Sequence, residues 1–124
     1  MATKKCVVTM VGPTNSIRLA AWSGSNLLNN GDDGEPFQFI DWADRALQVS
    51  GTFGVGGTLL IEGSNDGTNW STLSDLNGNS MSYTSATVKQ INEAPVYVRP
   101  RVSAGDGSTA LSVSIAARKV VSLL

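Results

Sequence analysis

Residues 58–70 read TLLIEGSNDGTNW, and this stretch decides the expected fold. Leu59 and Ile61 alternate with more outward-facing positions, which is the period-two pattern of a β-strand that places one face against a core. An Asp-Gly pair follows, and this dipeptide is a strong signal for the turn of a β-hairpin. Residues 70–73 supply the return strand. The stretch therefore predicts an antiparallel hairpin.

Short segments of the same kind fill the rest of the chain. The 13 glycines and four prolines are spread throughout and separate segments rich in Val, Thr, Ile, Leu and Ser. Since no stretch keeps helical spacing over three turns, we expect an all-β, antiparallel β-sandwich of about eight to ten short strands. The expected strands are residues 5–11, 17–22, 37–42, 45–53, 58–63, 70–73, 81–83, 87–91, 96–102 and 111–115.

The expected strand at residues 96–102 carries two further predictions. Pro100 cannot donate a ladder hydrogen bond, so the strand is predicted to be an edge strand or to contain a bulge. An edge strand would invite pairing between subunits. Tyr97, Arg99 and Arg101 share one face, which fits either a solvated face or a stripe at a partner interface.

The bulk composition predicts one domain over residues 1–124. Within it, residues 23–36 form a long polar loop, and residues 1–5 and 119–124 are expected to be extended termini. The net charge of −1 gives no broad electrostatic footprint for nucleic acid. The start of the chain has no apolar signal-peptide region, and the apolar runs are too short to span a membrane.

The two ends of the chain combine basic and apolar side chains. Such ends are candidates to reach a partner, and we expect them to contribute to an interface together with the outward face of residues 96–102. The candidate partner-interface residues are Lys4, Lys5, Tyr97, Arg99, Arg101, Val120, Val121, Leu123 and Leu124.

The sequence contains no histidine. This absence removes Ser-His-Asp triads, Cys-His pairs and most zinc sites. The single cysteine, Cys6, lies near the terminus in an expected strand, where a buried or merely tolerated thiol is favoured over a catalytic one. We therefore expect no enzyme, no catalytic residue, no cofactor and no metal.

Carboxylates leave two minor alternatives open. Asp32, Asp33 and Glu35 could bind calcium together with neighbouring asparagines, although a solvated acidic loop is favoured. A carboxylate pair could hydrolyse glycosides without histidine. The candidates for that pair are Asp41, Asp44 and Glu62, and nothing in the sequence places two of them together.

Three tryptophans, Trp22, Trp42 and Trp70, are favoured as core or core-rim residues over ligand platforms. Exposed, coplanar tryptophans would instead support a carbohydrate-binding sandwich. The glycine-rich residues 51–57 match no phosphate-binding pattern and predict a bulge or a tight corner.

From Leu47 to Arg118 the sequence resembles small virion proteins of tailed bacteriophages, of the capsid decoration (cement) type. The resemblance rests on four pieces in fixed order, and residues 1–44 match no such pattern. The pieces are residues 51–54 (GTFG), 60–70 (LIEGSNDGTNW), 96–102 (VYVRPRV) and 105–108 (GDGS), the last followed by the alternating final strand.

The resemblance implies a jelly-roll or related sandwich on the outer surface of a phage head, made in the host cytoplasm. Its expected partner is the major capsid protein, which it would clamp and stabilise, and a homo-oligomer (dimer or trimer) is expected. No nucleic acid or membrane partner is expected. Two alternatives remain open, namely another virion component such as a head-fibre base, neck or tail protein, and a carbohydrate-binding module.

Overall fold

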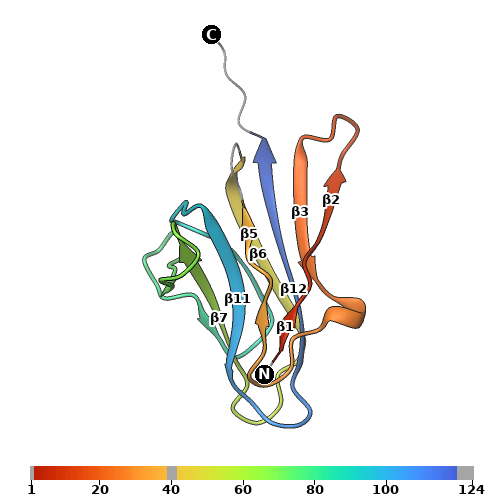
Figure 1. Cartoon of the computed structure of the whole chain (residues 1–124), viewed down its shortest axis with the longest axis vertical. Helices are drawn as coiled ribbons and strands as arrows, with labels where there is room; N and C mark the ends of the chain where they lie inside the picture. Colours follow the sequence, from red (N-terminus) through yellow and green to blue (C-terminus); the bar gives the residue numbers. More distant parts are fainter. Residues whose placement is uncertain (1, 39–41, 120–124) are drawn as a thin grey trace.

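The computed structural model describes residues 2–38 and 42–119, which build two facing β-sheets (Figure 1). The five-stranded sheet has the order β10 (Thr87–Gln90), β6 (Trp42–Thr52), β12 (Ala110–Lys119), β3 (Ile17–Trp22) and β2 (Val7–Val11). The seven-stranded sheet runs β1 (Thr3–Lys4), β4 (Asp33–Gly34), β11 (Tyr97–Ala104), β7 (Thr58–Ser64) and β8 (Ser71–Thr72), with β5 (Phe37–Gln38) on β11 and β9 (Ser82–Tyr83) on β7.

The strand order is that of a jelly roll. One sheet contains β3, β12, β6 and β10 in that order, and the other contains β4 or β5, β11, β7 and β8 or β9. From β3 onward the chain crosses to the opposite sheet at every connection except those joining β4 to β5, and β7 to β8 and β9. Two interlocked Greek keys with this arrangement define the jelly roll. The predicted antiparallel sandwich is therefore confirmed, with β1 and β2 added to it.

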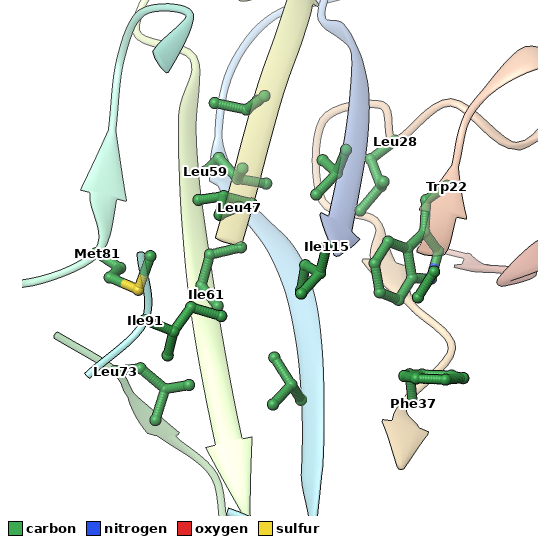
Figure 2. Packing of buried hydrophobic residues seen from close by; sticks show 14 of the residues in the cluster. Trp22, Leu28, Phe37, Leu47, Leu59, Ile61, Leu73, Met81, Ile91 and Ile115 are labelled. Atoms are coloured by element: carbon green, nitrogen blue, oxygen red, sulfur yellow. The ribbon is translucent and has the colours of Figure 1, made fainter. Parts of the chain in front are cut away.

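The core fills the space between the two sheets and follows from the alternation of each strand (Figure 2). Leu47 of β6 and Ile115 of β12 face Leu59 and Ile61 of β7, and all four side chains are inaccessible to solvent. Trp22 of β3 is also fully buried. Burial of such large side chains is the main term that favours the folded state.

The expected strands are largely present, with changes at their ends. The return strand of the first hairpin is β8, and Asp66 forms its turn by accepting hydrogen bonds from the backbone N–H groups of Thr68 and Asn69. The segment predicted as one strand over residues 37–42 begins as β5, and residues 39–41 lie outside the described residues.

The long polar loop at residues 23–36 has more structure than its sequence predicts. It contains a single 3-10 turn, η1 (Gly24–Asn26), and the short strand β4. Leu28 is fully buried and exchanges both backbone hydrogen bonds with Leu111. Among the described residues, no helix is long and apolar enough to cross a membrane.

The prediction that residues 96–102 form an edge strand is wrong. β11 lies inside its sheet, between β7 on one side and β4 and β5 on the other. Ile61, opposite Pro100, donates its N–H to the Met81 carbonyl and accepts the Leu73 N–H, on the side of the sheet away from β11. Pro100 therefore directs its backbone away from β7. The missing N–H therefore falls in the gap between β4 and β5, where it costs no ladder bond. A register irregularity does occur, between Val102 and Ala104.

The glycine-rich segment forms the tight corner between β6 and β7. Asp106, in the turn between β11 and β12, accepts hydrogen bonds from the backbone N–H groups of Val55 and Ser108. A Cβ added at Gly54 would lie only 2.2 Å from the Asp106 carboxylate, and Gly54 has a φ of 70°. The corner thus needs a residue without a side chain.

Gly54→Ala is expected to lower the free energy of unfolding by about 2–4 kcal/mol, because it combines left-handed backbone strain with a collision against Asp106. Gly56 has a similar φ of 71° but open space around its Cα, so Gly56→Ala is the matched control and should lose only about 1–2 kcal/mol. Urea denaturation measures both. Equal losses would contradict the close approach of Asp106.

The hydrogen bonds that Asp106 accepts, first from Val55 and then from Ser108, lower the pKa of its carboxyl from 3.8 to about 2. A lowered folded-state pKa stabilises the corner above about pH 4, and this contribution is lost as the pH falls through about 2. The hydrogen-exchange protection factor of the Val55 amide should fall over that interval. In Asp106→Asn, whose amide does not titrate, it should stay unchanged from pH 4 to pH 2; a pH-dependent fall in that variant would assign the effect to another group.

Candidate interaction surfaces

The acidic loop holds the N-terminal segment against the sandwich. The Asp32 carboxylate accepts a hydrogen bond from the Ala2 backbone N–H (3.0 Å) and lies 3.6 Å from the Lys4 Nζ. The Asp33 carboxylate accepts one from the Thr3 hydroxyl (2.6 Å). The Glu35 carboxylate accepts one from the Cys6 N–H (3.2 Å). These contacts fix β1 in parallel pairing with β4.

This arrangement changes the expected role of the N-terminus. Residues 1–5 were expected to extend from the sandwich, but Thr3 and Lys4 form a paired strand and Lys4 is half-buried beside an aspartate of its own chain. Lys5 remains exposed. Among the described residues, no cluster of Asp, Glu and Cys has the geometry of a metal site. The acidic side chains instead serve as hydrogen-bond acceptors.

The outer face of the seven-stranded sheet carries a network of charges. Glu62 of β7 accepts hydrogen bonds from the Arg99 Nε (3.0 Å) and the Arg101 Nε (3.1 Å), both on β11. Arg99 also reaches Asp33 of β4 (3.3 Å), and its guanidinium lies 4.1 Å from the centroid of a Trp70 ring. Arg99 is thus surrounded by partners from its own chain.

This network bears on the predicted stripe of Tyr97, Arg99 and Arg101. The side chains do share the outer face, since Val98, Pro100 and Val102 point inward. Glu62 is almost completely buried beneath the two arginines. A buried carboxylate needs such charge-assisted hydrogen bonds. Arg99 and Arg101 are therefore already bonded to Glu62 within this chain, and this bonding limits what they can offer to another protein.

None of the three tryptophans offers an open platform. Trp22 is fully buried, and its indole N–H donates a hydrogen bond to the Glu35 carbonyl (3.3 Å). Trp42 is partly buried, packs against the core, and lies 5.9 Å from the Arg18 guanidinium. Trp70 stacks against Arg99. The exposed, coplanar rings that a carbohydrate-binding site would use are not formed.

The remaining candidates for chemistry are dispersed. Burial raises the pKa of the Cys6 thiol from 9.0 to about 11, which keeps it protonated and unreactive at neutral pH. Asp44 is exposed in β6, whereas Glu62 is buried in β7 of the other sheet, and Asp41 lies outside the described residues. Val120, Val121, Leu123 and Leu124 also lie outside the described residues.

The outer face of the five-stranded sheet has a different character. Two complete rows of outward side chains cross all five strands, and neither row contains a charged residue. Arg118 lies in the next row, where it pairs with Ile17, and Ile17 pairs on its other side with Val11. The two rows are Val7, Ala21, Ser114, Gln48 and Val88, and Thr9, Leu19, Ala116, Ala46 and Gln90.

This uncharged outer face, as we call the two rows, was missed from the sequence. The solvent face of an antiparallel sheet is ordinarily polar. Here Val7 is 53% exposed and Val88 is 62% exposed, at opposite ends of one row. The signal was present as small and apolar outward residues in β3, β6 and β12. It becomes visible only once the register aligns those residues across five strands.

Comparison with known proteins supplies a likeness of fold. No family model and no curated protein matches the sequence. The structure resembles that of the SPBc2 prophage-derived protein YomS with a TM-score of 0.64 and 11% identity, over 82% of this chain and 91% of that chain. At this identity the likeness shows a shared fold with a prophage-derived protein. Protein NMB1881 from Neisseria meningitidis overlaps at a TM-score of 0.43 and 11% identity, over 92% of this chain and 82% of that chain, which is too weak to interpret.

Asp32→Ala should lower the free energy of unfolding by about 1–3 kcal/mol, because it removes the acceptor of the Ala2 and Asn29 backbone N–H groups and the partner of Lys4. The exposed Lys5 provides the control, and Lys5→Ala should change the free energy by less than about 0.5 kcal/mol. Urea denaturation compares the two. A loss for Asp32→Ala no larger than that for Lys5→Ala would show that the acidic loop does not hold the terminus.

Proposed function

We propose that this chain is a structural protein of a tailed-phage virion, a decoration protein that binds the outside of the major capsid protein lattice and stabilises the head. The observation that carries the proposal is the uncharged outer face of the five-stranded sheet. The sequence resemblance between Leu47 and Arg118 supplies the class of partner. The shared fold with a prophage-derived protein agrees with it.

The composition of the uncharged outer face suits a binding surface. Charged residues are depleted from the cores of protein interfaces, because each buried charge must be desolvated and paired. The rows combine exposed valines with alanine, serine, threonine and glutamine, so a partner can approach closely and still find hydrogen-bond groups.

The opposite sheet is the natural solvent side of a bound molecule. Its outer face carries Glu62, Arg99 and Arg101, whose charges are already paired with one another. A rigid jelly roll bound by one sheet would then present charge outward and add an interface to the shell. Because many copies bind one lattice, each contact can be weak and the sum still resists rupture of the head.

The test is binding to heads purified from the same phage after deletion of this gene. Gln48 and Gln90 are exposed and lie in the two rows, so Gln48→Glu with Gln90→Glu adds charge at constant shape. We expect the affinity for heads, measured by co-sedimentation over a titration, to fall by about tenfold or more, since about 1.4 kcal/mol is enough for tenfold.

Gln38→Glu is the matched control. It makes the same change at an exposed residue of β5, paired with Tyr97 on the other sheet, and should bind heads like the unchanged protein. Undiminished binding by the Gln48 and Gln90 variant would remove the uncharged outer face from the interface. If the unchanged protein does not sediment with heads, and antibody labels the neck or tail of whole virions, decoration is the wrong location.

A further inference from the structure

A second surface, the open edge of β2, lies beside the uncharged outer face. β2 forms the outermost strand of the five-stranded sheet and, within the described part of the chain, pairs only with β3 (Figure 1). Every residue from Val7 to Val11 is exposed, with Val8 at 39% and Met10 at 47%. None of the five is charged or a proline.

Sheet edges of this kind are ordinarily protected against pairing with another chain. Proteins use inward charges, proline, bulges or a covering segment for the purpose. β2 keeps an unbroken register with β3 from Val7 to Val11, so it has no bulge. Within residues 2–38 and 42–119, the cover that the hydrogen bonds show is at one end, where the Glu35 carboxylate accepts the Cys6 N–H and closes the edge before the strand begins.

The direction of the backbone groups along β2 follows from the neighbouring ladder. Lys119 donates to the Ser16 carbonyl, so the even-numbered residues of β3 bond to β12 and the odd-numbered ones bond to β2. Val7, Thr9 and Val11 are the partners on β2, which leaves the N–H and C=O groups of Val8 and Met10 directed to the open edge. The outward direction of the Cys6 N–H agrees with this alternation.

We propose that β2 pairs with β2 of a second copy of this chain, in antiparallel register about a two-fold axis at Thr9. Val8 then exchanges both backbone hydrogen bonds with the partner's Met10, and Met10 does the same with the partner's Val8. Val7 lies across from the partner's Val11, and the two threonines meet at the axis. Each cross-strand pair is apolar or threonine with threonine, which are favourable combinations.

Charge favours a second copy as the occupant. A strand evolved to meet an acidic or basic partner would carry complementary charge, and β2 carries none. In the antiparallel register Lys5 lies near the partner's Pro13, and the two copies of Lys5 are at opposite ends of the joint strand pair. Like charges therefore do not meet, whereas a parallel pairing would place them together.

The dimer is independent of capsid binding, because it uses the edge of the sheet and leaves its face free. The two-fold axis runs perpendicular to the joined sheet, so the two uncharged outer faces lie on the same side of it. If the proposed function holds, the dimer presents a doubled surface to the lattice.

Oligomeric state is measured by sedimentation velocity on the unchanged protein at micromolar concentration, where a dimer of twice 13.0 kDa is expected. Met10→Pro removes an N–H that points to the open edge, so it spares the ladder to β3 and should yield a folded monomer. Val8→Lys should do the same by placing like charges across the axis. Val88→Lys, on the opposite edge strand β10, is the control and should remain dimeric. Circular dichroism verifies the fold of each.

Cysteine cross-linking tests the register between the two β2 strands, because an unfolded variant would not form a disulfide selectively at one position. In a Cys6→Ser background, T9C should form an intermolecular disulfide on mild oxidation, because the two residues meet at the axis. V88C, at a position that is also exposed, should remain uncross-linked under the same conditions. A monomeric unchanged protein, a Met10→Pro variant that stays dimeric, or cross-linking of T9C no faster than V88C would each overturn the proposal, whatever the outcome with phage heads.

Discussion

Trp22 is the side chain through which the two sheets and the acidic loop are held in one arrangement. It projects from β3 of the five-stranded sheet, is fully buried, and donates its indole N–H to the Glu35 carbonyl. Gly34 lies against the indole, and a Cβ there would be 2.6 Å from the indole nitrogen and from the Pro100 ring. The loop that contains β4 is therefore positioned by the Trp22 ring, and its close approach requires a glycine at position 34.

Several features of the surface follow from that contact. With the loop fixed, Asp32, Asp33 and Glu35 hold the N-terminal segment, and Asp33 also meets Arg99. The charges of the seven-stranded sheet are thus paired internally, and the edge near Cys6 is closed. What remains for a partner is the less charged side of the molecule, namely the outer face of the five-stranded sheet and the edge of β2.

The sequence was informative where a pattern is local. Alternation over residues 58–64 and the Asp-Gly turn predicted the central hairpin, because burial of every second residue leaves a readable period. Two-residue strands such as β1 and β4 are too short to show a period, so the hydrogen bonds between the acidic loop and the N-terminal segment could not be predicted. Pro100 was misjudged as an edge residue because tolerance of its missing N–H depends on a gap between two segments distant in sequence.

The interaction surfaces could be recognised only from the pairing register of the strands. Glu62 was considered as half of a catalytic pair, and only the pairing of β7 with β11 shows it between Arg99 and Arg101. The residues predicted to reach a partner divide accordingly, with Lys4 engaged by its own chain and the arginines satisfied by Glu62. The uncharged rows assemble residues spread over more than half the chain.

The central claim is that the uncharged outer face of the five-stranded sheet binds a phage head. A density map of the intact virion tests it most directly, because it shows both the position of the chain and the face turned toward the shell. The account predicts density for this jelly roll on the outside of the head, with the row containing Gln48 and Ser114 against the capsid protein and Arg99 directed to solvent. Density only in the neck or tail, or a head-bound molecule with Arg99 and Arg101 facing the shell, would contradict it.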